Sequence, residues 1–75
     1  MALSTGQIAK LTDSQLLTRI AEESSEVIKA AMKHHEYGER PHADGVDYNN
    51  VRDVNEEFDQ LALLIVEYRH RFGWM

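Results

Sequence analysis

The chain contains no cysteine and a single proline among its 75 residues. The absence of cysteine excludes disulfides and cysteine-ligated zinc sites, and it fits a reducing compartment. No uninterrupted apolar run is long enough to cross a bilayer, and the first residues lack the charged and apolar regions of a secretory signal. We therefore expect a cytoplasmic protein that does not contact a membrane.

Basic residues are few: 8 lysines and arginines stand against 13 aspartates and glutamates, and the net charge is −5. Proteins that bind nucleic acid need basic surface to neutralise phosphates, so this composition argues against nucleic-acid binding. The same charge would repel a free nucleotide unless bound cations reverse the local field. The length allows one small domain, residues 1–75, and a core of this size rarely supplies more than about 3–5 kcal/mol.

The spacing of the apolar residues predicts two long helices. The first begins near Thr12, which stands at capping-box spacing from Gln15, and it ends at Gly38. The second begins around Asp47 to Asn50, any of which could cap it, and it ends at Gly73.

Two segments lie outside these helices. Residues 1–11 carry Ile8 and Leu11 three positions apart, and we expect a short turn or helix that packs on a neighbouring element. Residues 38–49 include two glycines and the only proline, which predicts a loop. A connection of about twelve residues is long for a compact domain and is often functional.

Both predicted helices have wide apolar faces. The apolar and small residues of the first face are Leu16, Leu17, Ile20, Ala21, Ser24, Val27, Ile28, Ala31 and Met32. Those of the second face are Val51, Val54, Phe58, Leu61, Ala62, Ile65, Val66, Tyr68 and Phe72. Two helices cannot bury such faces against each other alone. We therefore expect an all-α fold of two long antiparallel helices and a short N-terminal segment, completed as a helical bundle by homo-oligomerisation into a dimer or larger assembly.

Acidic residues lie at the edges of these faces. On the first helix, Glu23 falls at the margin of the apolar face, Glu26 one step outside it and Glu22 further toward solvent. On the second helix, Asp59 falls at the margin and Glu56 just outside it. Carboxylate oxygens are the preferred ligands of hard cations such as Mg²⁺. The two edges are therefore predicted to hold such an ion between the helices.

The pattern Glu22-Glu23-x-x-Glu26 followed by Glu56-x-x-Asp59 resembles the signature of the MazG-like all-α nucleotide pyrophosphohydrolases. The resemblance covers residues 16–66 and is greatest to the small phage-type and cassette-type members. Members of that family are helical homo-oligomers that hydrolyse nucleoside triphosphates to the monophosphate and pyrophosphate, with Mg²⁺ as cofactor. The gap between the two motifs is toward the long end for the family, and many relatives add another helix after the second motif. We therefore expect that the missing surface comes from a partner subunit or that the active site is incomplete.

The resemblance also implies roles for individual residues. Mg²⁺, or Mn²⁺ in its place, would offset the charge of the acids and help to generate an attacking hydroxide. Glu22 or Glu23 would orient that water as a catalytic base. The implied metal ligands are Glu23, Glu26, Glu56 and Asp59, with Glu22 in support.

Two lysines follow the acids on the first helix. Lys29 and Lys33 lie one and two turns beyond them and are candidates to contact the substrate phosphates, although solvated helix lysines are the ordinary alternative. Because the acids occupy the phosphate end, we expect the nucleoside to contact residues 38–49 or a neighbouring subunit.

Three function classes follow from these features. The first is an Mg²⁺-dependent pyrophosphohydrolase acting on ribonucleoside or deoxyribonucleoside triphosphates. The second is a non-catalytic helical interaction protein of the same fold. The third is a di-iron or di-manganese carboxylate bundle, for which Glu67-x-x-His70 supplies one copy of a motif that such sites use twice.

Overall fold

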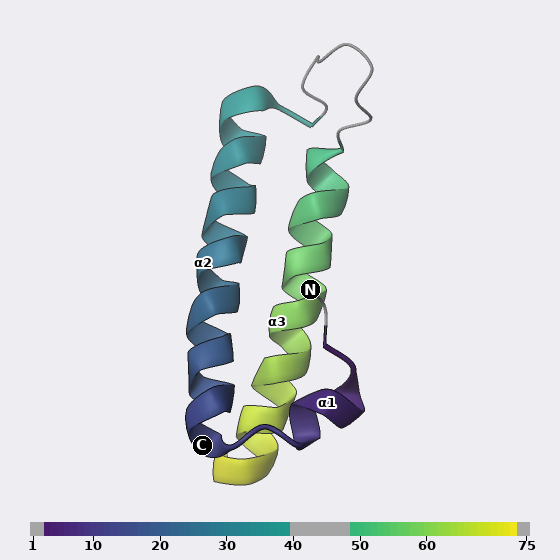
Figure 1. Ribbon diagram of the computed structural model, residues 1–75. Helices are drawn as coiled ribbons and strands as arrows, with labels where there is room; N and C mark the ends of the chain where they lie inside the picture. The colour runs from purple at the N-terminus through teal and green to yellow at the C-terminus, as the bar shows by residue number, and fades with distance from the viewer. Residues whose placement is uncertain (1–2, 40–48, 74–75) are drawn as a thin grey trace.

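The computed structural model describes residues 3–39 and 49–73, and these residues form three helices and no strand (Figure 1). Helix α1 spans Thr5–Ala9, α2 spans Asp13–Tyr37 and α3 spans Asn50–Phe72. The predicted all-α class is confirmed for this part of the chain. Most of the predicted loop, residues 40–48, lies outside the described residues. None of the described helices combines the length and the apolar content that a membrane crossing requires.

The predicted ends of the long helices are confirmed: side chains cap the starts of both helices, and a glycine ends α2. Thr12 Oγ1 accepts the N–H of Gln15 at 3.1 Å, and Gln15 Oε1 accepts the N–H of Thr12 at 2.9 Å. Gly38 ends α2 at a φ of 79°, in a region that glycine enters without strain. Asn49 caps α3 by accepting the N–H of Arg52 at 3.0 Å.

The predicted short N-terminal element is the five-residue helix α1. Ser4 and Gln7 close a second capping box, with hydrogen bonds of 2.8 and 3.2 Å between each side chain and the other backbone N–H. Arg71, near the end of α3, donates from Nη2 to the carbonyl oxygens of Ile8 and Ala9 at 3.2 and 3.3 Å. These bonds fasten α1 to the last turn of α3.

Helices α2 and α3 lie side by side (Figure 1). Where α2 ends and α3 begins, Asn50 donates from its side chain to the carbonyl oxygen of Gly38 and from its backbone N–H to that of Glu39, both at 2.8 Å. At the other end of the pair, Arg71 lies 3.1 Å from Asp13. The extents are 45 × 24 × 15 Å, and a helix with its side chains is about 10–12 Å across. The pair therefore forms one layer.

The buried core is small and lies near α1. Its fully buried members are Ile8, Leu16 and Leu64, with Leu3, Leu11 and Ile20 packed against them. Each of the three helices contributes one residue to this core, so α1 closes the end of the helix pair.

The face that α3 turns toward α2 differs from the predicted apolar stripe. Phe58 and Val66, which belong to that stripe, are exposed, whereas Asn50, Gln60 and Leu64 are buried. The observed face is rotated by about 100°, one residue step, from the predicted one. Apolar periodicity identifies the most apolar face of a helix. In α3 part of that face, at Val54, Leu61 and Ile65, is half-buried, and the rest is exposed in the described structure.

Candidate functional site

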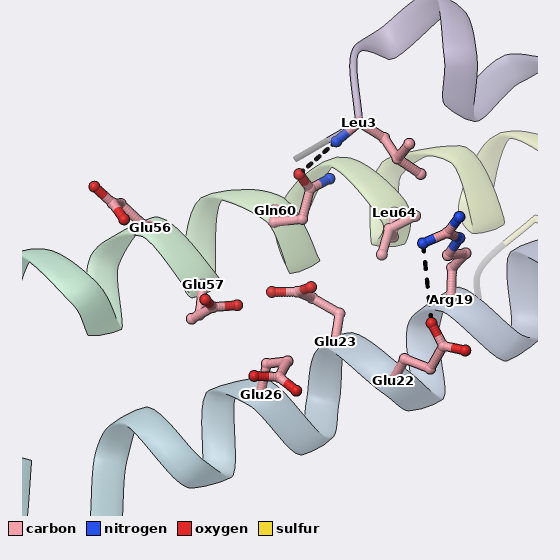
Figure 2. A pocket seen from close by; sticks show the side chains of 9 residues that line it. All are labelled: Leu3, Arg19, Glu22, Glu23, Glu26, Glu56, Glu57, Gln60 and Leu64. Atoms are coloured by element: carbon pink, nitrogen blue, oxygen red, sulfur yellow. Dashed lines mark hydrogen bonds and ion pairs between the residues drawn. The ribbon is translucent and has the colours of Figure 1, made fainter. Parts of the chain in front are cut away.

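A pocket of about 350 Å³ opens between α2, α3 and the segment before α1 (Figure 2). Small-molecule sites usually occupy about 300–1,000 Å³, so the volume suits a small ligand. The wall is mainly acidic. Its carboxylates belong to Glu22, Glu23, Glu26, Glu56 and Glu57.

Glu23 is the half-buried acid at the centre of this wall. Figure 2 shows its carboxylate reaching across from α2 toward α3. Its Oε1 atom is buried and, within the described residues, has no hydrogen-bond partner. Burial raises the pKa of Glu23 to about 7, helped by the hydrogen bond that the protonated carboxyl makes to Glu57 and by the negative charges of Glu57 and Glu26. A carboxylate in these surroundings is stabilised by a proton or by a cation.

Glu26 lies one turn beyond Glu23 on the same side of α2. It accepts a hydrogen bond from Lys29 Nζ at 3.3 Å, and its side chain is half exposed. In Figure 2 the carboxyl groups of Glu23, Glu26 and Glu57 occupy the space between the two helices. These three acids therefore form the acidic end of the pocket.

Glu22 and Glu56 lie at the rim. Glu22 is 3.9 Å from Arg19 Nη1, and both side chains are largely exposed. Glu56 is 3.8 Å from Arg52 Nε, and in Figure 2 its carboxylate points away from the other acids. Exposed ion pairs of this length contribute little, so both carboxylates are free to reorient.

The remaining predicted ligand, Asp59, is exposed and does not line the pocket. Glu57, which was not among the predicted ligands, lines the pocket at the place on α3 that was expected for Asp59. Asn50, Glu57, Leu64 and Arg71 form one line along α3 at a spacing of seven residues, and only the tertiary contacts of this line single out Glu57. The first and last of these fasten the ends of the helix pair, and Leu64 lies in the core. Whether Asp59 ligates a metal stays a prediction of the resemblance.

The two predicted substrate lysines lie beside the acids rather than among them. Lys29 and Lys33 line an adjoining hollow of about 250 Å³, together with Asn50 and Asp53. The acids that line both hollows are Glu26, Glu56 and Glu57. The lysines are therefore next to the acidic end, on the side where α2 ends and α3 begins.

The donor set suits a hard divalent cation. It consists of carboxylates, and one of their oxygens is buried without a partner. In the conformation seen, no three acidic or histidine side chains of the described residues stand close enough together to hold one ion. Binding would therefore require rotation of the neighbouring glutamates toward Glu23.

Comparisons with protein-family models, with curated proteins and with solved structures found no match to this chain.

Proposed function

We propose that this chain is an Mg²⁺-dependent nucleoside triphosphate pyrophosphohydrolase, which converts NTP or dNTP and water to the monophosphate and pyrophosphate. The main support is the half-buried Glu23 side chain between α2 and α3, whose buried Oε1 atom has no hydrogen-bond partner among the described residues and which lies beside Glu57. A bound cation would offset the cost of burying the negative charge of Glu23 and would reduce the repulsion between these acids. The resemblance to the MazG-like family supplies the reaction.

The residues that would hold the cation are Glu23, Glu26 and Glu57, with Glu56 turning in from the rim. When bound, Mg²⁺ would offset their charge and polarise the phosphate oxygens. Without a cation, an acidic pocket repels a triphosphate, so binding of nucleotide and binding of metal should depend on each other.

The chain's own residues would move the proton. A water oxygen forms a bond to the α-phosphorus while the bond from that phosphorus to the bridging oxygen breaks, and pyrophosphate leaves with the electron pair. Glu22 or Glu23 accepts the proton of the water. A carboxylate that holds a cation is the weaker base, so Glu22 at the rim takes this role when Glu23 is a ligand. Lys29 and Lys33, beside the acids, would contact the phosphates.

We propose that the two long helices form an antiparallel pair and that the chain functions as a homodimer or larger homo-oligomer. Ile28 and Phe58 are 64% and 49% exposed, which is unfavourable for large apolar side chains in a free monomer. Ile28 lies about 160° around α2 from Glu26, and Phe58 lies about 160° around α3 from Glu56. A second copy can therefore cover the apolar side of the layer and leave the acidic pocket open.

The same exposed apolar residues favour a second candidate function, a non-catalytic helical interaction protein of this fold. In that case the exposed side would bind a different protein, and the acids would form a solvated surface. The two candidates differ in a single observable, the metal-dependent release of pyrophosphate.

The test is a screen of ribonucleoside and deoxyribonucleoside triphosphates with Mg²⁺, scored separately for pyrophosphate and for single phosphate. The proposal requires pyrophosphate from at least one nucleotide, its loss with excess chelator and its loss in Glu23→Gln. Absence of pyrophosphate with every nucleotide, from a folded protein, would favour the interaction protein.

A further inference from the structure

The acidic pocket also contains a buried hydrogen-bond donor. Gln60 lines the pocket and is only 9% exposed. Its Oε1 atom accepts the backbone N–H of Leu3 at 2.8 Å. A backbone N–H can only donate, so the amide oxygen of Gln60 must face Leu3 and the amide nitrogen must face the other way. That nitrogen, Nε2, is buried and has no hydrogen-bond partner in the described part of the chain.

The unpaired nitrogen is turned toward the end of the pocket where Arg19 and Leu64 lie (Figure 2). Within residues 3–39 and 49–73, the ion pair of Arg19 is its 3.9 Å contact to Glu22, which is weak and exposed. A buried amide donor without an acceptor is costly, and a guanidinium prefers oxyanions. This end of the pocket therefore presents two donors, and the described residues supply no acceptor for Gln60 Nε2.

The order of charged groups along the helix pair indicates how a bound triphosphate would be oriented. The lysine-lined hollow lies toward the ends joined by Asn50 and Gly38, the acids lie in the middle, and Arg19 lies about two helical turns before Glu26. A cation held by the acids would attract phosphate oxygens to the middle of this row. The donor end then lies on the side away from Gly38 and Asn50.

We propose that Gln60 Nε2 and Arg19 bind the pyrophosphate portion of the substrate, so that Gln60 is a positioning residue held in place by the backbone of Leu3. We rest this inference on the proposed function, which identifies the ligand as a triphosphate. The segment before α1 thereby becomes part of the site, because its N–H orients the amide.

Three variants test the inference. Gln60→Glu keeps an oxygen to accept the Leu3 N–H but replaces the donor with an acceptor. Arg19→Gln removes the second donor from an exposed position. The matched control is Arg52→Gln, which makes the same change in charge at a similarly exposed arginine (51% against 47%) that does not line the pocket.

The primary measurement is calorimetric titration of inorganic pyrophosphate into the full chain with Mg²⁺, alongside KM and kcat for nucleotide hydrolysis. We expect Gln60→Glu and Arg19→Gln each to weaken pyrophosphate binding and raise KM by about tenfold, and Arg52→Gln to change neither. Binding of Mg²⁺ alone should not weaken in Gln60→Glu, because the change adds a carboxylate.

The outcomes separate this inference from the proposed function. If nucleotides are hydrolysed but both pocket variants bind pyrophosphate like the control, Gln60 Nε2 meets only water and the inference is wrong. If no nucleotide is hydrolysed but pyrophosphate binds and depends on Arg19 and Gln60, the phosphate site stands and the hydrolase proposal fails. Failure of pyrophosphate to bind the folded wild-type protein with Mg²⁺ overturns the inference directly. If Gln60→Glu does not fold, Arg19→Gln decides.

Discussion

Arg71 Nη1, in the last turn of α3, donates a 3.1 Å hydrogen bond to Asp13 Oδ1, in the first turn of α2. The same guanidinium donates to Glu67 at 2.7 Å and to the carbonyl oxygens of Ile8 and Ala9. One side chain, 16% exposed, therefore joins all three helices at the end of the layer that holds the core.

Arg71→Gln should lower the free energy of unfolding by about 1–3 kcal/mol, because it removes charge-assisted hydrogen bonds from a largely buried position. Arg52→Gln removes the same charge from an exposed position and should cost less than about 0.5 kcal/mol. Chemical denaturation of the two variants measures both values. Equal stability of the two proteins would show that Arg71 does not fasten the helices.

Two single substitutions on α3 test which acid binds the metal, Glu57, which lines the pocket, or Asp59, which the sequence motif implies. Glu57→Gln should weaken Mg²⁺ binding by about tenfold or more and reduce turnover with it, because Glu57 lies against Glu23 in the pocket. Asp59→Asn should have a much smaller effect if its exposed position persists in the active protein. Isothermal titration with Mg²⁺ measures the metal affinity of both variants, and an assay of pyrophosphate release measures their turnover. The reverse result would make Asp59 the ligand and require α3 to rotate.

The metal-free protein should become less stable as pH rises from about 4.5 to about 7. Burial, the hydrogen bond to Glu57 and the nearby negative charges raise the pKa of Glu23 from its ordinary value of 4.5 to about 7. Between these values the folded state binds more protons than the unfolded state, so the stabilisation is complete below the window and is lost as pH rises through it.

Glu23→Gln should reduce the dependence of the free energy of unfolding on pH between about 4.5 and 7. In metal-free protein near neutral pH it should raise the free energy of unfolding by about 1 kcal/mol, because it removes the repelling charge. Denaturation with chelator present, across this pH range, compares the variant with the wild type. Parallel pH profiles for the two proteins would contradict the raised pKa.

Ile28→Glu should dissociate the assembly, because it places a charge in the apolar side of the layer that a second copy is proposed to cover. Ser14→Glu adds the same charge at an exposed polar position in the first turn of α2 and serves as the control. Sedimentation at micromolar concentration should show a smaller species for Ile28→Glu alone. A wild-type chain that sediments as a stable, folded monomer would refute self-association.

Binding of a non-hydrolysable triphosphate should require Mg²⁺, and each should strengthen the binding of the other. The physical reason is that five glutamates line the pocket, so without a cation they repel the phosphates. Calorimetric titration with Mg²⁺ and then with excess chelator tests the linkage. Equal affinity in the two conditions would show that the phosphates bind elsewhere.

The sequence by itself determined the helices and their ends, because capping acts over a few residues. Thr12 and Asn49 begin their helices through hydrogen bonds to backbone N–H groups three residues away. Gly38 ends α2 through its own backbone conformation. None of these needs a partner distant in the chain. Apolar periodicity likewise placed Leu16 inside and Glu23 at the margin of α2, because a local face of regular spacing defines the buried side.

Only the tertiary structure decided the rotation of α3. Asn50 bonds to Gly38 at the end of α2, and Arg71 bonds to Asp13 at its beginning. Leu64, between them, packs into the core. The line through these three residues must therefore face α2. Glu57 is on that line and is therefore carried into the pocket, whereas Asp59 is carried to the surface. Helix rotation depends on partners distant in the chain, and no local spacing of acids contains that information.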